Sequence, residues 1–290
     1  MEGLRVAVVG VGRAGGALGR ALFAAGLPIA AVWSRTTARA QELADETGAQ
    51  VCSSPAEAAA SATLVLLAVT DALIAPFAAA LAAEAHPLPD AVIVHLSGAS
   101  GADVLAPLAA SGWRTAAFHP LQTFADSRSP LLPGSLCAIE GDPSTFQLLA
   151  GVAERLGATV LALAAADRPL YHAAATITAN YTVTLVSQAA ALLARCGLDQ
   201  QQSLAALLPL LRGAVENLQR VGLPDALTGP IVRGDVLTIQ RHLTALAERA
   251  PELLPSYRAL GAATLPLARV RGTDQHELAQ IAEVIVQYTQ

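Results

Sequence analysis

His119 has the side-chain type and the position for acid–base chemistry. It directly follows the apolar run Thr115–Phe118, which predicts a buried strand, so it lies at the carboxyl end of that strand. Histidine is the usual proton donor or acceptor near neutral pH, and ligands of α/β sheets bind at this edge. We interpret His119 as a candidate catalytic residue. Because Pro120 follows it, a structural role in shaping the loop is the alternative.

A second histidine begins a row of polar side chains on a predicted helix. His172, Thr176, Asn180 and Thr184 recur every four residues and share one flank of an otherwise apolar helix. That flank can close a substrate pocket, in which His172 or His119 transfers a proton, Asn180 orients the substrate and Thr176 contacts it. The alternative is that these four side chains are buried between packed helices, where other groups satisfy their hydrogen bonds.

A turn in the second half of the chain carries a charged pair. The segment TGPIVRGD, Thr228–Asp235, places glycine, proline and two charges between predicted helices. If the turn reaches an active site, Arg233 can bind a substrate carboxylate as a fork, with Asp235 beside it. An Arg233–Asp235 ion pair that only fixes the turn is the alternative.

The remaining candidates are weaker. Tyr171 and Tyr257 are possible proton donors, whereas His86, His242 and His276 lie in polar surroundings typical of a protein surface. No cluster of histidines and carboxylates has the spacing of metal ligands, so we predict no metal site.

A glycine-rich segment near the start of the chain predicts a dinucleotide site. The aliphatic run Val6–Val9 leads into a GxGxxG turn and then into an alanine-rich helical pattern. The first glycine allows a tight turn, the second lets the backbone approach a pyrophosphate, and the third lets helix and strand pack closely. The helix N-terminus then holds the phosphates, so the predicted contacts are Gly10, Val11, Gly12, Arg13, Ala14 and Gly15. A closely packed turn without a ligand is the alternative.

The end of the second predicted strand indicates which dinucleotide binds. Here an NAD site usually carries a carboxylate for the ribose 2′-hydroxyl, but this chain has Ser34, Arg35 and Thr36, with Arg39 one turn further. A guanidinium flanked by hydroxyls suits a 2′-phosphate, which favours NADP over NAD. The alternative is that these residues only cap the next helix.

Two further strand ends supply cofactor contacts. The apolar run Thr63–Val69 and the strand Ala91–Val94 both end in small or polar residues. Because the carboxyl ends of parallel strands meet at one edge of the sheet, we expect the cofactor to contact Val69, Thr70, Ser97 and Gly98.

The composition limits the partners and the location. The 290 residues are 53% hydrophobic and 14% charged, which is typical of a well-buried globular protein. A net charge of −5 argues against nucleic-acid binding, and polar residues interrupt every apolar run of membrane-spanning length. Three widely spaced cysteines, Cys52, Cys137 and Cys196, indicate buried thiols in a reducing compartment. A strand begins too soon after Met1 for a signal peptide, so we expect a cytoplasmic protein that binds neither nucleic acid nor membrane.

The order of the patterns predicts two domains. Strand and helix patterns alternate up to Leu163, and from Asp167 onward every pattern is helical. We predict an α/β Rossmann domain with a doubly wound, mostly parallel sheet at residues 1–165. An all-helical domain at 166–290 follows. Its apolar composition predicts at least a dimer.

Four ordered motifs resemble one family over essentially the whole chain. They are HLSGA at 95–99, FHPLQTF at 118–124, YHAAATITAN at 171–180 and the TGPIVRGD turn. Together they resemble the Rossmann-like plus DUF2520 proteins, usually labelled NADP oxidoreductases. That family is similar to the 6-phosphogluconate dehydrogenase-like reductases, including pyrroline-5-carboxylate reductase, ketopantoate reductase and prephenate dehydrogenase. The resemblance implies hydride transfer and a helical domain of the 6-phosphogluconate dehydrogenase type that binds substrate and forms a homodimer.

The absence of lysine separates this chain from two of these relatives. All 18 Lys+Arg residues of this chain are arginines. The β-hydroxyacid dehydrogenases and ketopantoate reductase, by contrast, use a lysine as acid or base. Neither mechanism carries over. We therefore expect an NADP(H)-dependent enzyme that reduces or oxidises a small, carboxylate-bearing carbonyl, imine or alcohol substrate with histidine assistance. An NADP(H)-binding sensor without turnover and a deazaflavin-dependent reductase are the alternatives.

Overall fold

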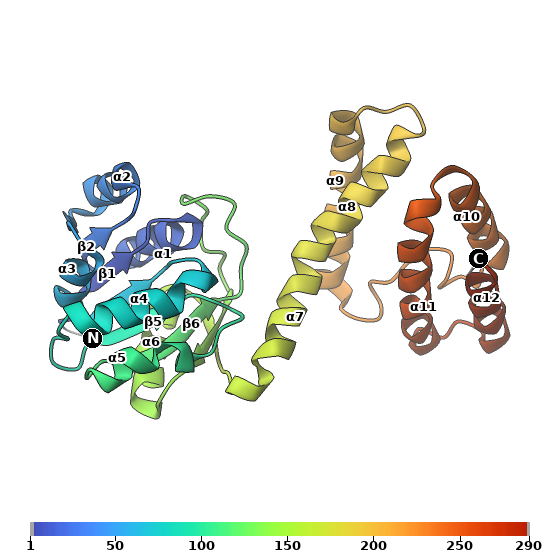
Figure 1. The fold of residues 1–290 in the computed structure, drawn as a ribbon. Coiled ribbons are helices and arrows are strands. Elements are labelled where there is room, and N and C mark those ends of the chain that lie inside the picture. The colour runs from blue at the N-terminus through green and yellow to red at the C-terminus, as the bar shows by residue number, and fades with distance from the viewer. Residues whose placement is uncertain (1–2, 289–290) are drawn as a thin grey trace. The chain divides into compact units, whose positions relative to one another are not determined.

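The computed structural model describes residues 3–288, which form two compact units (Figure 1). The first unit extends to Ala179 and the second begins at Asn180. The sequence placed a domain boundary after residue 165, ahead of helix α7 (Arg168–Thr178), whereas the compact first unit includes α7. This helix belongs with the sheet because its Arg168 and Tyr171 side chains bond to sheet residues.

The first unit is built on one eight-stranded sheet. Its strand order is β3-β2-β1-β4-β5-β6-β7-β8, and every neighbouring pair is parallel except β6 and β7. The order runs outward in both directions from β1, which confirms the predicted doubly wound, mostly parallel fold. The strands are β1 (Val6–Val9), β2 (Ile29–Trp33), β3 (Gln50–Val51), β4 (Leu64–Leu67), β5 (Val92–His95), β6 (Arg114–Pro120), β7 (Leu136–Glu140) and β8 (Thr159–Ala162).

Helices cover both faces of this sheet because its strands are apolar on both sides. Val6 and Val8 point into a core with helices α1 (Arg13–Ala24), α2 (Thr37–Thr47) and α6 (Pro143–Arg155). Ala7 and Val9 point into the opposite core. That second core contains α3 (Pro55–Ala60), α4 (Asp71–Glu84) and α5 (Ala106–Ala110). Alternate residues of one strand thus serve opposite layers, as in a buried parallel strand.

Strand β6 is longer than the sequence predicted. We expected it to end at Phe118, with His119 just beyond it, but the strand continues through Pro120. The reason is the antiparallel neighbour β7, which pairs Ala138 with His119 and Cys137 with Pro120. A run of apolar residues does not reveal such pairing. His119 is consequently held by the sheet itself at the carboxyl end of β6.

The second unit consists of helices only, as predicted. They are α8 (Asn180–Ala194), α9 (Gln200–Val221), α10 (Val236–Arg249), α11 (Leu254–Val270) and α12 (Gln275–Gln287), with a short 3₁₀ turn at Pro251–Leu253. Its core joins α10, α11 and α12 through Leu243, Leu254 and Ile281. Side-chain caps from Asp199, Asp235 and Asp274 begin α9, α10 and α12.

An exposed apolar helix joins the two units along the chain. Among residues 3–288, only Ala165–Ala194 is a helical stretch long and apolar enough to cross a membrane, and its most apolar window of 18 residues has a mean hydropathy of 1.2 and no buried residue. A helix that passes this test alone is weak evidence for a membrane span.

The third glycine of the loop generates a stability prediction. A Cβ on Gly15 would overlap the Gly10 carbonyl oxygen and lie 2.6 Å from the Ala68 Cβ. Gly15→Ala should therefore lower the free energy of unfolding by about 1–3 kcal/mol, despite the higher helix propensity of alanine. Gly12→Ala is the matched control because a Cβ there meets nothing within 4 Å. Urea unfolding measures both variants, and equal stability of the two would contradict this packing account.

Candidate functional site

The predicted cofactor residues lie together at the carboxyl edge of the sheet. The Gly10 amide donates to the Trp33 carbonyl at 2.8 Å, which places the glycine loop beside the end of β2. The Ala68 amide donates to the Val9 carbonyl at 2.8 Å, which places Val69 and Thr70 on the other side of the loop. Helices α1 and α4 both begin at this edge, so the free amides of two helix N-termini face the same region.

The glycine loop is shaped as a phosphate-binding turn requires. Gly10 has φ +107°, a left-handed conformation that favours glycine, and a Cβ there would lie 2.9 Å from the Ala68 carbonyl carbon. Gly12 has open space where a Cβ would stand, so its backbone is accessible. Gly15 is buried against β1 and β4. The three glycines thus have the separate roles expected of the GxGxxG fingerprint.

The end of β2 presents a basic, hydroxyl-bearing surface. Arg35, Thr36 and Arg39 are exposed, and Ser34 is half-buried. Thr36 occupies the N-cap position of α2, but its side chain makes no cap hydrogen bond. The predicted alternative, in which these side chains only cap the helix, therefore has no support from the Thr36 hydroxyl.

His119 and His172 come together at Gly98. A Cβ built on Gly98 would lie 2.8 Å from the His119 Nε2 and 2.8 Å from the His172 Nδ1. The distance between the His119 Nε2 and the His172 Nδ1 is therefore at most twice 2.8 Å. A Cβ at Gly98 would therefore overlap both rings, so the absence of a side chain at Gly98 is what lets the two histidines approach this point. Gly98 and Ser97 were predicted from the sequence as cofactor contacts, and the structure brings Gly98 and both candidate acid–base residues to one point.

His119 also borders the glycine loop. A small cavity of about 70 Å³ is lined by Ala14 of the loop, by His119 and by Phe124, among others. The candidate proton-transfer residue and the candidate dinucleotide loop are thus neighbours within one unit.

Tyr171 holds the His119 ring. The tyrosine hydroxyl lies 2.7 Å from the His119 Nδ1, and the two rings meet edge to face with centroids 5.5 Å apart. The other acceptor near this hydroxyl, the His119 carbonyl, is 3.5 Å away. The short contact favours donation from the tyrosine to Nδ1, and the ring proton of a neutral His119 then sits on Nε2, which faces Gly98.

The surroundings keep His119 uncharged. Burial lowers the pKa of His119 to about 4, and the electrostatic effects of the neighbouring His172 and Arg168 contribute to the same shift. Burial also raises the pKa of Tyr171 to about 12, so its hydroxyl stays protonated. At neutral pH His119 is therefore a hydrogen-bond donor, but it holds no extra proton to give away.

A buried ion pair that the sequence analysis missed supports this arrangement. The Arg168 guanidinium is 2% exposed and donates to the Glu140 carboxylate at 2.6 and 2.9 Å. It also reaches the carbonyls of Ser97 and Gly98 at 3.4 Å. Arg168 begins α7 and Glu140 ends β7, so the only sequence signal was a charged residue at the end of each element.

The segment from His95 to Gly101 is fixed by its own hydrogen bonds. The buried His95 ring accepts from the Ser97 amide at Nδ1 and contacts the Gly101 carbonyl at 2.9 Å with Nε2. The Ser97 hydroxyl accepts from the amides of Ala99 and Ser100. Burial lowers the pKa of His95, which keeps it neutral in this role. The Ser97 side chain is thus engaged in the turn, and both Ser97 and Gly98 are buried.

The other predicted substrate residues divide between the two units. Thr176 is half-buried on α7, one turn after His172, within the first unit. Asn180 begins α8, and Arg233 and Asp235 lie before α10, all in the second unit. Arg233 is exposed, whereas Asp235 caps α10 by accepting from the Thr238 amide at 3.0 Å and hydroxyl at 2.7 Å. These bonds hold the pKa of Asp235 below its usual range.

The His119 environment yields a prediction for NMR. In a pH titration, the His119 ring should remain neutral through pH 6 and take up a proton only near pH 4. Nitrogen chemical shifts at pH 7 should show the proton on Nε2, and Tyr171→Phe should allow both tautomers. His119→Gln assigns the signal. Titration of His119 near 6.5 would contradict the buried, positively surrounded site.

Comparisons with known proteins cover both halves of the chain. Residues 1–120 match the Rossmann-like domain, and residues 135–264 match DUF2520, a domain of unknown function. No curated protein sequence matches the chain.

Solved structures share this architecture over nearly the whole length. The "putative NADP oxidoreductase BF3122" from Bacteroides fragilis is 24% identical, with a TM-score of 0.72, over 97% of this chain and 98% of that one. An imine reductase from Myxococcus stipitatus in complex with NADP+ is 19% identical, with a TM-score of 0.63, over 96% and 99%.

A pyrroline-5-carboxylate reductase from Coxiella burnetii is 12% identical, with a TM-score of 0.60, over 100% of both chains. At these identities the likeness establishes the fold. Together with the two domain matches, it confirms the resemblance inferred from the four motifs. The order of the two matches, a Rossmann-like domain followed by DUF2520, is the order that the four motifs indicated.

Proposed function

We propose that this protein is an NADP(H)-dependent oxidoreductase that transfers a hydride to or from a small carbonyl, imine or alcohol substrate. One observation carries the proposal: the glycine loop and the His119–His172 pair lie at the same edge of one sheet, and His119 lines a small cavity together with Ala14 of that loop. The fold is shared with an imine reductase in complex with NADP+ and with a reductive aminase from Aspergillus terreus in complex with NADPH. NADP(H) supplies the hydride chemistry, and the chain supplies binding, orientation and proton transfer.

The amide-rich edge and the end of β2 would hold the cofactor. Residues Gly10–Gly15 would bind the pyrophosphate through backbone amides at the start of α1, with Val69, Thr70, Ser97 and Gly98 lining the remainder. The exposed Arg35, flanked by Ser34 and Thr36, would pair with the ribose 2′-phosphate. Because no carboxylate stands at this strand end, a 2′-phosphate meets no repulsion there.

The two histidines would have different roles in the reaction. Addition of a hydride to a carbonyl or imine carbon moves an electron pair onto the oxygen or nitrogen, where negative charge develops. The neutral His119 would stabilise that charge by donating a hydrogen bond from Nε2, and His172, whose Nδ1 faces the same point, would supply the proton. The low pKa of His119 supports a role as hydrogen-bond donor for this residue, and His172 is the other histidine at this point.

The remaining predicted residues would bind the substrate. Thr176 and Asn180 follow His172 at helical spacing and would orient the substrate's polar groups. Arg233 would bind a substrate carboxylate, with Asp235 fixing the turn that carries it.

Of the three free cysteines, Cys52 and Cys137 are buried as expected, and these thiols agree with the cytoplasmic location that we propose. Cys196 is exposed, which corrects the expectation that all three are buried.

We further propose a homodimer formed through the helical unit. A groove of about 560 Å³ runs between α8 and α9 and is lined mainly by apolar side chains, including Val183 and Leu208. Val183 is 70% exposed. Such contiguous apolar surface is typical of an interface, and a second copy of the same helices is its expected cover.

Cofactor selectivity tests the first part of this proposal. Nicotinamide fluorescence should show tighter binding of NADPH than of NADH, and Arg35→Ala should weaken NADPH binding at least tenfold because it removes a charged partner of the 2′-phosphate. NADH binding should not change. Arg155→Ala, an exposed arginine on α6, is the control. Equal or absent binding of both dinucleotides would favour a deazaflavin or another ligand.

Turnover tests the roles of the histidines. On a substrate found by screening keto acids and imines with NADPH, His172→Ala should lower kcat by about 10²–10⁴-fold and leave NADPH binding unchanged, because a positioned acid is lost. His276→Ala, on the exposed surface of α12, should keep full activity. Wild-type turnover by His172→Ala would contradict the assignment of His172 as the proton donor. Tight NADPH binding without turnover on any substrate would favour a sensor.

The oligomeric state tests the helical interface. Light scattering should give a mass near twice 29.6 kDa for the wild type. Val183→Glu should shift the protein to a monomer because it places a charge in an apolar interface. Val270→Glu, at a residue that is 74% exposed and outside the groove, should remain a dimer. A monomeric wild type would rule out this interface.

A further inference from the structure

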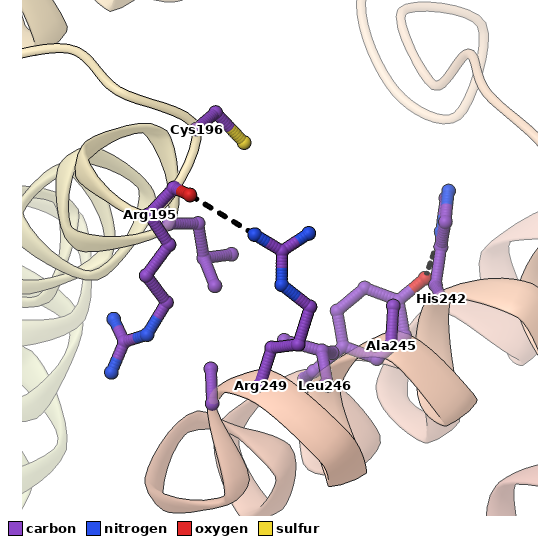
Figure 2. A pocket seen from close by; sticks show the side chains of 9 residues that line it. Arg195, Cys196, His242, Ala245, Leu246 and Arg249 are labelled. Carbon is purple, nitrogen blue, oxygen red and sulfur yellow. Dashed lines mark hydrogen bonds between the residues drawn. The ribbon is translucent and has the colours of Figure 1, made fainter.

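A second candidate site lies within the helical unit. A cavity of about 340 Å³ is enclosed by the end of α8, by α10 and by the start of α11. Figure 2 shows the side chains that line it. Leu192, Leu246 and Tyr257 form apolar walls, and this volume falls at the lower end of the range for small-molecule pockets. None of its residues belongs to the glycine loop or to the histidine pair.

The polar groups of this cavity are predominantly basic. Arg195, Arg249 and His242 line it, and no acidic residue does so among the described part of the chain. Arg195 pairs with Glu252 at 2.5 Å, so its charge is compensated. One guanidinium nitrogen of Arg249 instead donates a hydrogen bond to the neutral backbone carbonyl of Arg195 at 3.0 Å. Figure 2 shows the Arg249 guanidinium extending from α10 toward Arg195 and Cys196.

The opposite wall presents a histidine–tyrosine pair. The His242 Nδ1 and the Tyr257 hydroxyl are 2.7 Å apart, with the rings edge to face. This bond fixes the Tyr257 ring as a flat apolar wall. Burial raises the pKa of Tyr257, so no phenolate charge opposes an anion here. His242 is exposed, as the sequence predicted, and Tyr257 was predicted only as a possible proton donor. Their separation of 15 positions gave no sign that the two side chains pair.

We propose that this cavity binds a small organic acid with an aromatic or aliphatic body, through Arg249. One uncompensated guanidinium provides a fork that matches a single carboxylate, whereas a phosphate ester would call for more donors than the cavity shows. The leucine and tyrosine walls match an apolar body. The site is separate from the proposed hydride-transfer site because all its residues come from the second unit.

Cys196 provides a direct reporter for the test. It lines the cavity and is exposed, whereas Cys52 and Cys137 are buried, so a trifluoromethyl thiol can be attached to Cys196 alone. The full-length protein is titrated with phenylacetate and with its uncharged analogue, phenylacetamide, and fluorine NMR follows the label. Calorimetry on unlabelled protein gives the same affinities without the tag.

The expected result is a saturable shift with phenylacetate and binding at least tenfold weaker for phenylacetamide and for Arg249→Gln, which corresponds to about 1.4 kcal/mol. Arg269→Gln, an exposed arginine in the last turn of α11, should bind phenylacetate as the wild type does. Absence of binding, equal binding of the acid and amide, or unchanged binding by Arg249→Gln would each overturn the proposal. So would displacement by NADPH, or a native Cys196 that does not react because a second copy covers it.

Discussion

Arg168 places a guanidinium group where almost no solvent reaches it, and the candidate site depends on how that charge is satisfied. Glu140 at the end of β7 supplies the carboxylate, and the Ser97 and Gly98 carbonyls complete the surroundings. Loss of one partner of such a pair leaves a buried charge, typically at a cost of about 3–5 kcal/mol. The pair therefore fixes the start of α7 against the ends of β5 and β7.

Each feature of the site follows from that attachment. Tyr171 and His172 are the third and fourth residues after Arg168 along α7, so the ion pair sets where both side chains stand. Tyr171 can then bond to the His119 ring, and His172 can approach Gly98. The charge of Arg168 also helps to keep His119 neutral. One interaction thus positions two side chains and contributes to the electrostatics of a third.

The sequence predicted what depends on local patterns. The glycine loop can be recognised from the sequence because its strand, turn and helix are consecutive. The helical second unit was predicted from uninterrupted helical periodicity. His119 was found because its strand is apolar and ends near it. The predicted end of that strand was wrong because β7, an antiparallel neighbour, determines it.

Contacts between distant residues could not be read from periodicity. Arg168 and Glu140 are 28 positions apart, and Tyr171 and His119 are 52 apart. Nothing in the spacing of these residues pairs them. The neutral state of His119 depends on burial by the fold, so the sequence indicated a generic acid or base where the structure indicates a hydrogen-bond donor.

The central claim is that the dinucleotide binds at the carboxyl edge of the sheet, with its nicotinamide end near the His119–His172 pair. A crystal structure of the complex with NADP+ tests it most directly. The account predicts the pyrophosphate on the amides of Gly10–Gly15 and the nicotinamide ring beside the histidine pair. A nicotinamide bound away from both histidines, or a pyrophosphate away from the glycine loop, would contradict it.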